Sequence, residues 1–221
     1  YAANTGMCIA SPHNEVMGCT GFTGESPGNR TMAAGYTGRG ASEVMAFADN
    51  PVAAITMWVG SVWHRLPILD PWTTELGYGH AAKCDTIDFG RGTPAPEDTV
   101  VVYPYDGQID VATSFDGSRE GPMPPAPTTG WPSAMPITVY AQMMTVTEHV
   151  LTIDGNSTPI EHVWLTAVES SFLRNAIMLY ANAPFAPQTT YRVKITGTHV
   201  GGPLALEWTF KTGDAPRFGR P

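Results

Sequence analysis

The stretch "WVGSVWHRLPILDPWTTELGYG", residues 58–79, decides how the first half of the chain folds. It continues an apolar segment that begins at Asn50 and Pro51, where the asparagine can cap a helix and the proline suits its first position. His64 and Arg65 stand at the end of this helix, and "PILDP" stops it because two prolines so close together cannot lie in one continuous helix. Helical spacing predicts one buried apolar face, made of Val52, Ile55, Val59 and Val62.

Short elements are predicted on both sides of this helix. Upstream, Ser26 and Pro27 mark the start of another helix, which Gly35 ends after "NRTMAA". Downstream, "TELGYGHA" and "CDTIDFG" indicate two short strands. Residues 1–92 therefore combine helices and strands, and we expect an α+β domain.

The second half of the chain has the period of β-strands. In "TYRVKITGT" and "LALEWTFKT" apolar and polar residues alternate, as in strands with one buried face. "TVVVYPYDG" and "QIDVATSFDG" both end in Asp-Gly, which predicts hairpin turns, and further strands are predicted in "ITVYAQMMTVT", "HVLTIDG" and "EHVWLTAV". We therefore predict an all-β, antiparallel sandwich over residues 99–213, with a linker at 93–98 before it and a loose tail, 214–221, after it.

The composition is typical of a loop-rich extracellular protein. The 221 residues include 23 Gly and 20 Pro, and only 14% are charged. The net charge of −8 argues against a nucleic-acid partner, because phosphate binding needs a basic face. No run of 18 apolar residues is present, so no membrane-spanning helix is predicted. The chain begins with Tyr1 and has no signal peptide, which is expected of a mature or trimmed secreted chain.

Three cysteines and two sequons fit the same setting. Cys8 and Cys19 are spaced to close a small disulfide loop, which would leave Cys84 free, buried or paired outside the chain. The alternative is three unpaired, buried thiols. Asn29 and Asn156 each begin an Asn-x-Ser/Thr triplet and are candidate glycosylation sites.

A series of motifs follows in order along residues 11–92. They are His13, Arg30 with "AAGY", Ser42-Glu43-Val44, Trp58-x-x-Ser61-x-x-His64-Arg65, and Glu75 with "GYG". In this order they resemble bacterial members of the CAP superfamily, the cysteine-rich secretory, antigen 5 and pathogenesis-related proteins. The resemblance implies a CAP α-β-α sandwich with a reduced front, because the family's first helix is missing from the twelve residues before His13. That helix is either upstream and removed, absent, or replaced by another chain that covers the same surface.

The resemblance also implies an open cleft lined by two histidines and two glutamates, which in some members binds a divalent metal through the histidines. Here His13 and His64 would be the pair, with Glu43 as one acid. The fourth place, a glutamate in eukaryotic members, is Ser61, and this departure argues against catalysis. Glu15 can face the same side of an extended segment as His13 and so replace the missing glutamate. Two imidazoles alone would hold Zn²⁺ weakly, because zinc sites in proteins use three or four protein ligands.

A purely structural role stays open for each of these residues. A histidine at a helix end can bind the last carbonyls, and Glu43 can accept hydrogen bonds from the loop after Gly40. Arg65 is expected to pair with Asp70 or with a backbone carbonyl rather than with a ligand.

The sandwich region resembles bacterial Ig-like domains through "VVVYPYDG", "PFAPQTTYRVKITGT" and "LEWTFKTG". The two resemblances together imply a secreted, non-enzymatic binding module at the bacterial cell surface. The alternative is a structural subunit of an extracellular filament or another self-assembled surface structure, in which chains associate head to tail through uncovered apolar surface and free strand edges. A hydrolase ranks last, because no serine or cysteine has the sequence context of a nucleophile elbow or a triad.

Overall fold

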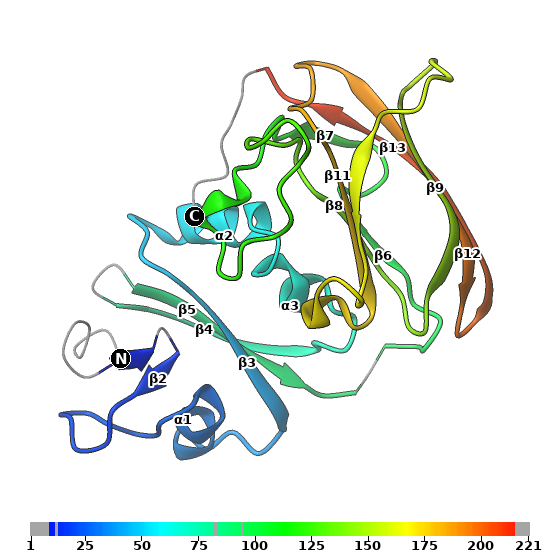
Figure 1. Cartoon of the computed structure of the whole chain (residues 1–221). Coiled ribbons are helices and arrows are strands. Elements are labelled where there is room, and N and C mark those ends of the chain that lie inside the picture. The colour runs from blue at the N-terminus through cyan, green and yellow to red at the C-terminus, as the bar shows by residue number, and fades with distance from the viewer. Residues whose placement is uncertain (1–8, 12, 82–83, 94, 215–221) are drawn as a thin grey trace. The chain divides into compact units, whose positions relative to one another are not determined.

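The computed structural model describes residues 9–11, 13–81, 84–93 and 95–214, and strands dominate its secondary structure (Figure 1). Within this described part, no helix is long and apolar enough to cross a membrane. The elements in chain order are β1 (Ile9–Ser11), β2 (Asn14–Glu15), α1 (Pro27–Ala33), β3 (Arg39–Ala46), α2 (Pro51–Gly60), α3 (Arg65–Leu69), β4 (Glu75–Ala81), β5 (Cys84–Arg91), β6 (Val101–Tyr103), β7 (Gln108–Val111), β8 (Ile137–Tyr140), β9 (Thr145–Ile153), β10 (His162–Leu165), β11 (Ala176–Ala181), β12 (Thr190–His199) and β13 (Gly202–Thr212).

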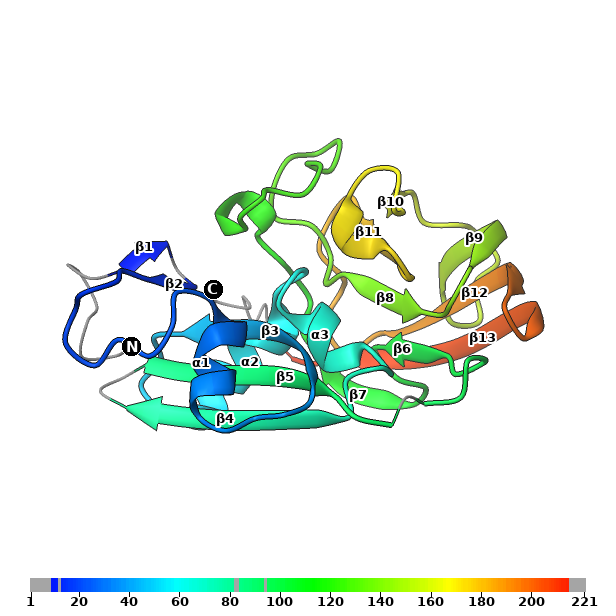
Figure 2. The same cartoon turned by 90° about the horizontal axis from the view of Figure 1, so that it is seen from below.

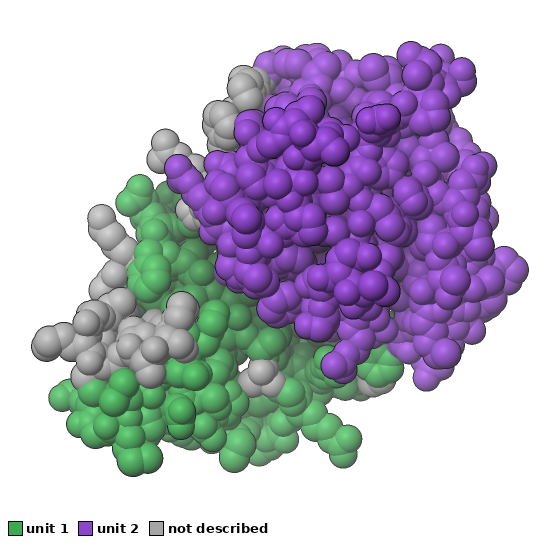
Figure 3. Space-filling view, viewed as in Figure 1, with its two compact units in different colours: residues 1–59, 72–95 green, residues 60–71, 96–221 purple. Residues whose placement is uncertain are grey.

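The chain forms two compact units. Unit 1 is residues 1–59 with 72–95, and unit 2 is residues 60–71 with 96–221 (Figure 3). The segment 60–71, which contains Ser61, His64 and Arg65, belongs to the second unit rather than to the first. The reason is its packing, because its apolar side chains join the core of unit 2 and its Trp63 indole donates a hydrogen bond to the carbonyl of Pro122 at 2.6 Å.

Unit 1 is built on an antiparallel sheet in the order β3-β5-β4. The two strands predicted after the helix are confirmed as β4 and β5. Helix α1 begins as predicted, with Ser26 as its cap and Pro27 in its first turn, and it contacts β3 (Figure 2). Glu43 and Asp88 lie opposite each other on β3 and β5 and so project to the same face. The neighbouring strand positions project to the other face and are buried at Val44, Ala46, Ile87 and Phe89.

The predicted CAP α-β-α sandwich is wrong. The described helices α1, α2 and α3 have only 7, 10 and 5 residues, so none is longer than about 15 Å at 1.5 Å per residue. Helices of this length cannot build two full layers over a sheet, and α3 belongs to unit 2. The described chain is predominantly β and contains several separate sheets.

Helix α2 begins at Pro51 as predicted, but it ends at Gly60 instead of at His64 and Arg65, and its buried face is not the predicted one. Val52 and Ile55 are 73% and 48% exposed, whereas Ala54 and Trp58 are buried. Ala54 and Trp58 are four residues apart, so they also form one helical face. The indole buries much more apolar surface than valine or isoleucine can, so the helix turns this face inward.

Unit 2 confirms the predicted β-sandwich, but the sandwich is not wholly antiparallel, because β7 pairs with β13 in the parallel direction. Its two four-stranded sheets have the orders β10-β11-β8-β6 and β7-β13-β12-β9 (Figure 2). The predicted pairing of "TYRVKITGT" with "LALEWTFKT" is confirmed as β12 and β13, with Tyr191 opposite Phe210. The largest fully buried apolar side chains of this unit are Tyr180, Phe210, Ile137, Leu151, Leu165, Leu173, Met178, Leu179, Ile195 and Val62.

The two predicted Asp-Gly hairpins are wrong. Strand β6 lies in one sheet and β7 in the other, so Asp106 and Gly107 carry the chain between sheets. This turn is held by β13, because Asp106 Oδ1 accepts from the N–H of Thr209 at 3.1 Å and Gly107 donates to the Thr209 carbonyl at 2.8 Å. The second pair, Asp116 and Gly117, opens a short 3-10 helix with Asp116 as its cap.

Arg65 is wholly buried in unit 2. Its guanidinium donates to the carbonyls of Ser61 and Pro136 and lies 4.4 Å from the ring centroid of Tyr103. These contacts confirm the expected pairing with a backbone carbonyl. Burial lowers the pKa of Arg65 to about 10, which still leaves it cationic at neutral pH.

Candidate functional site

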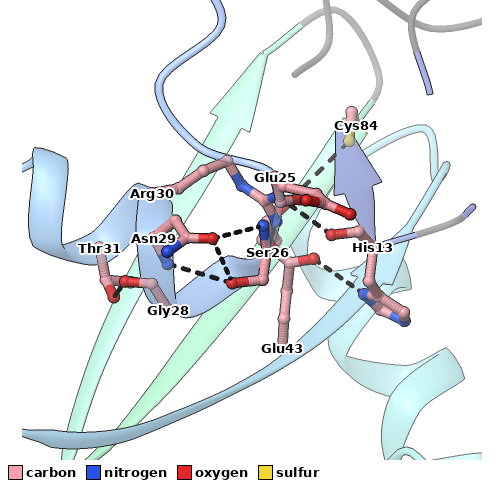
Figure 4. Close-up of polar contacts among 10 residues, drawn as sticks. His13, Glu25, Ser26, Gly28, Asn29, Arg30, Thr31, Glu43 and Cys84 are labelled. Carbon is pink, nitrogen blue, oxygen red and sulfur yellow. Dashed lines mark hydrogen bonds and ion pairs between the residues drawn. The ribbon is translucent and has the colours of Figure 1, made fainter. Parts of the chain in front are cut away.

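His13, Arg30 and Glu43 form one hydrogen-bonded cluster in unit 1 (Figure 4). His13 Nδ1 lies 2.8 Å from Glu43 Oε1, and the Arg30 guanidinium donates to Glu43 Oε2, also at 2.8 Å. Arg30 projects from α1 and donates in addition to the backbone carbonyls of His13 and Glu25. The Glu43 side chain is almost fully buried, whereas that of His13 is 40% exposed. The cluster therefore fixes one edge of the imidazole and leaves the other edge accessible.

A second carboxyl group, that of Asp88, faces this cluster from β5. Burial, and after it the neighbouring Glu43 carboxylate, raises the pKa of Asp88 to about 6. One of its oxygens, Oδ1, is buried and has no hydrogen-bond partner among the described residues. A buried oxygen of this kind destabilises the fold until a donor reaches it. The Asp88 carboxyl group can therefore accept a hydrogen bond from a bound group or take up a proton.

A pocket of about 410 Å³ lies over this face of the sheet in unit 1. Asp88 contributes to its lining, together with Thr31 and Ala34 from α1 and with residues of β4. Tyr36 also lines it and donates to Glu75 at 2.7 Å, and this hydrogen bond raises the pKa of the phenol. Glycine at position 90 leaves room for this ring, because a Cβ atom there would lie 2.1 Å from the Tyr36 hydroxyl and would displace it. The size is in the range of small-molecule sites.

Ser61 and His64, the other predicted cleft residues, lie in unit 2 between α2 and α3. Ser61 Oγ is 2.7 Å from His64 Nδ1, and Glu120 Oε2 is 4.0 Å from the same nitrogen. Glu120 also accepts from the backbone N–H of Val62 at 3.3 Å. The Glu120 carboxyl is nearly fully buried, whereas the His64 side chain is 39% exposed. The serine and the acid thus approach one edge of the ring.

The predicted cleft residues are therefore divided between the two units. His13 and Glu43 are hydrogen-bonded in unit 1, and Ser61 and His64 are hydrogen-bonded in unit 2. Their convergence around a shared ligand stays a prediction. Among the described residues, no group of three or more histidine, cysteine or acidic side chains could hold a metal ion. A weak zinc site that used only the two histidines stays a prediction as well.

The remaining predicted residues take separate positions. Glu15 is buried on β2, where its backbone N–H donates to the carbonyl of Glu25 at 2.9 Å. Cys84 is a buried free thiol at the start of β5, and burial raises its pKa. The Cys8–Cys19 pairing stays a prediction, because Cys8 lies outside the described residues. Both sequon asparagines are exposed, Asn29 in α1 and Asn156 in the turn after β9.

Sequence reasoning missed Asp88 and Glu120. Strand periodicity could have placed Asp88 on the face of "CDTIDFG" opposite to Ile87, but no local pattern pairs it with Glu43. Glu120 lies in the proline-rich stretch, far along the chain from His64, and only tertiary packing joins them. Comparison with protein-family models and with curated proteins found no match for the chain. The function is therefore inferred from the geometry of these groups.

Proposed function

We propose that this chain is a secreted, non-enzymatic binding module of the bacterial cell surface, in which unit 1 takes a small ligand and the β-sandwich of unit 2 acts as a spacer or display domain. The low charged fraction and the many glycines and prolines support the extracellular setting. The motifs that resemble the CAP superfamily supply the residues of the unit 1 cluster, although the α-β-α architecture implied with them is not present.

The observation that carries this proposal is Asp88, a residue that lines the pocket and whose buried Oδ1 has no hydrogen-bond partner among the described residues. A ligand with an N–H or O–H group gives this oxygen the hydrogen bond it lacks, and an apolar part of the ligand covers the walls formed by Ala34 and the aromatic ring of Tyr36. The ligand class that fits is a small, partly apolar molecule with one hydrogen-bond donor, for which a primary amine or an alcohol qualifies.

The geometry around Ser61 supports a non-enzymatic role. In a catalytic triad the nucleophile and the orienting acid contact opposite nitrogens of the histidine ring. Here Ser61 and Glu120 both approach Nδ1 of His64. The acid therefore does not hold the ring in the tautomer that would remove a proton from this serine, and Ser61 itself is buried.

The test is a fragment screen on the full chain, followed by amide chemical-shift mapping with a panel of small amines, alcohols and matched hydrocarbons. Binding is expected to shift amides of β4, β5 and α1 and to favour the compounds that carry a donor. Asp88→Ala, which removes the accepting oxygen, is expected to abolish this preference, whereas Glu25→Ala, which removes an exposed carboxyl of the same unit, is expected to leave it unchanged. Hydrocarbons that bind as well as the amines would contradict the assigned role of Asp88, and a pocket that takes none of the compounds would contradict the proposal.

The exposed strand β4 favours a second candidate, the self-assembled structural subunit. Every residue of β4 is exposed, and β4 is an edge of the β3-β5-β4 sheet among the described residues. Exposed strand edges recruit further strands. Sedimentation of the full chain at micromolar concentration tests this function, and Leu76→Lys on β4 is expected to prevent association while Val52→Lys on α2, at similar exposure, does not. A chain that sediments as a monomer throughout would contradict it.

A further inference from the structure

Two histidines meet at one open side of the β-sandwich in unit 2. Strand β9 is an edge of one sheet and β10 is an edge of the other. On β9, His149 lies opposite the buried Ile195 of β12, so its side chain projects to the interior side of the sheet. Its ring stacks on Trp164 of β10, with ring centroids 3.9 Å apart and planes 4° from parallel. His149 Nδ1 also lies 2.8 Å from His162 Nε2 on β10. Side chains of the two edge strands thus connect the two sheets.

The partners of His162 fix where the protons are when both rings are neutral. His162 Nδ1 lies 2.8 Å from the carbonyl oxygen of Ile160, which can only accept, so Nδ1 carries the hydrogen. Nε2 of the neutral His162 ring is then an acceptor. The donor to it must be the N–H at Nδ1 of His149. Both nitrogens of His162 are therefore satisfied, and Nε2 of His149 is the atom at which a first additional proton enters.

The pair tolerates one additional proton and not two. A first proton on His149 leaves a single hydrogen between the two facing nitrogens, so the hydrogen bond persists. A second proton gives both of these nitrogens an N–H group, and two donors 2.8 Å apart repel each other. We infer that His149 and His162 form a pH-sensitive latch, which holds the β9 and β10 edges together while the pair carries at most one extra proton and releases them when both rings are protonated.

Other ionisable groups lie on the elements around the pair, and the charged ones on β9 and β12 are ion-paired with other residues. Among the described residues, the hydrogen bonds of the two rings run only to each other and to the Ile160 carbonyl. The ionisable groups on the surrounding elements are Glu148 on β9, Tyr191, Arg192, Lys194 and His199 on β12, Tyr180 on β11 and Glu161 just before β10. Glu148 pairs with Lys194 at 3.0 Å, and Arg192 pairs with Asp154 and Glu207. These ion pairs are already neutralised, and histidine is the side chain whose charge ordinarily changes near pH 6, so His199 at the end of β12 is the group that a control must exclude.

The direction of the pH effect follows from proton counting. Burial, and after it the neighbouring His162, lowers the pKa of His149 below its ordinary 6.5. Independently of this shift, the latched state holds at most one additional proton, whereas in the open state both rings can be protonated near the ordinary histidine pKa of about 6.5. The latch is fully stable above this pH and weakens as the pH falls below it. For one excluded proton, the ratio of open to closed edge rises about tenfold for each pH unit below about 6.5.

Amide hydrogen exchange of the full chain, followed by NMR, tests the latch. Protection factors of the β10 amides are expected to fall about tenfold between pH 7.5 and pH 5.5, while those of the central β12–β13 pairing stay unchanged. His149→Gln is the decisive variant, because a side-chain amide can donate to His162 when that ring is neutral and accept from it when it is protonated. The variant is expected to keep β10 protected at both pH values. His199→Asn, which removes a histidine of the same sheet outside the pair, is expected to behave like the native chain.

Three results would overturn the latch. The first is a native chain whose β10 protection changes by less than about twofold over this range. The second is a His149→Gln chain with the native pH dependence. The third is a gain of β10 protection on adding micromolar Zn²⁺ at neutral pH, lost in His149→Gln, which would assign the pair to a metal instead. Ring ¹⁵N shifts of the native chain give an independent readout, because they must show the Nδ1–H tautomer of His162 at neutral pH.

Discussion

Replacement of Asp88 by asparagine is expected to stabilise unit 1 at neutral pH. The pKa of Asp88 is about 6 in the folded chain and 3.8 for an ordinary aspartate. As the pH rises from 3.8 to about 6, the carboxyl ionises more readily in the unfolded chain, so the free energy of unfolding decreases, and it stays at this lower value above about pH 6. At 1.36 kcal/mol per pH unit, this gap corresponds to at most about 3 kcal/mol. Partial exposure and solvent screening reduce it to about 1–2 kcal/mol. Asparagine imitates the protonated side chain, because its amide can still donate to Glu43.

Urea unfolding monitored through the β5 amide signals, at pH 7.5 and near pH 4, measures this effect in unit 1. The Asp88→Asn chain is expected to be more stable by about 1–2 kcal/mol at pH 7.5 and by less than about 0.5 kcal/mol near pH 4, where native Asp88 is already protonated in the fold. Glu25→Gln makes the same change in net charge at an exposed position and controls for general charge effects. An equal gain at both pH values, or a loss at pH 7.5, would show that Asp88 is not held at a raised pKa by its surroundings.

Three further outcomes are expected. Arg65→Met should destabilise unit 2 by about 3 kcal/mol in urea unfolding, because two buried backbone carbonyls lose their donor, and a change below about 1 kcal/mol would contradict this role. Gly197→Ala should cost about 2 kcal/mol or more in the same assay, since its Cβ would lie 2.0 Å from the carbonyl oxygen of Thr145, and native-like stability would refute the packing argument. Calorimetric titration with Zn²⁺ should give a dissociation constant that is micromolar or weaker and a signal that vanishes in His64→Ala, whereas tight binding that survives the substitution would place the metal elsewhere.

Local sequence signals determined much of the secondary structure. Two of these signals act over only a few neighbouring residues, and both predicted the observed element. They are the cap at Ser26 followed by Pro27, and the alternating pattern of residues 190–212. Part of the unit 1 cluster could also be predicted from the sequence, because the order of His13, Arg30 and Glu43 along the chain resembles a known series of motifs. The face of α2 was misread, since two apolar faces were available and the choice depends on which side chains the rest of the fold can bury.

Only the tertiary structure decided how these elements combine. The motif order alone does not fix helix length or the number of layers, so the α-β-α expectation failed while part of its residue set was still brought together. The Asp106-Gly107 dipeptide is a strong local signal for a hairpin. In the fold its hydrogen bonds with Thr209 of β13 direct the chain into the other sheet instead. The carboxyl pair of Glu43 and Asp88, and the histidine pair of β9 and β10, depend on strand register and on the meeting of two sheet edges. Burial and long-range pairing set their protonation, and neither quantity is encoded in a short stretch of sequence.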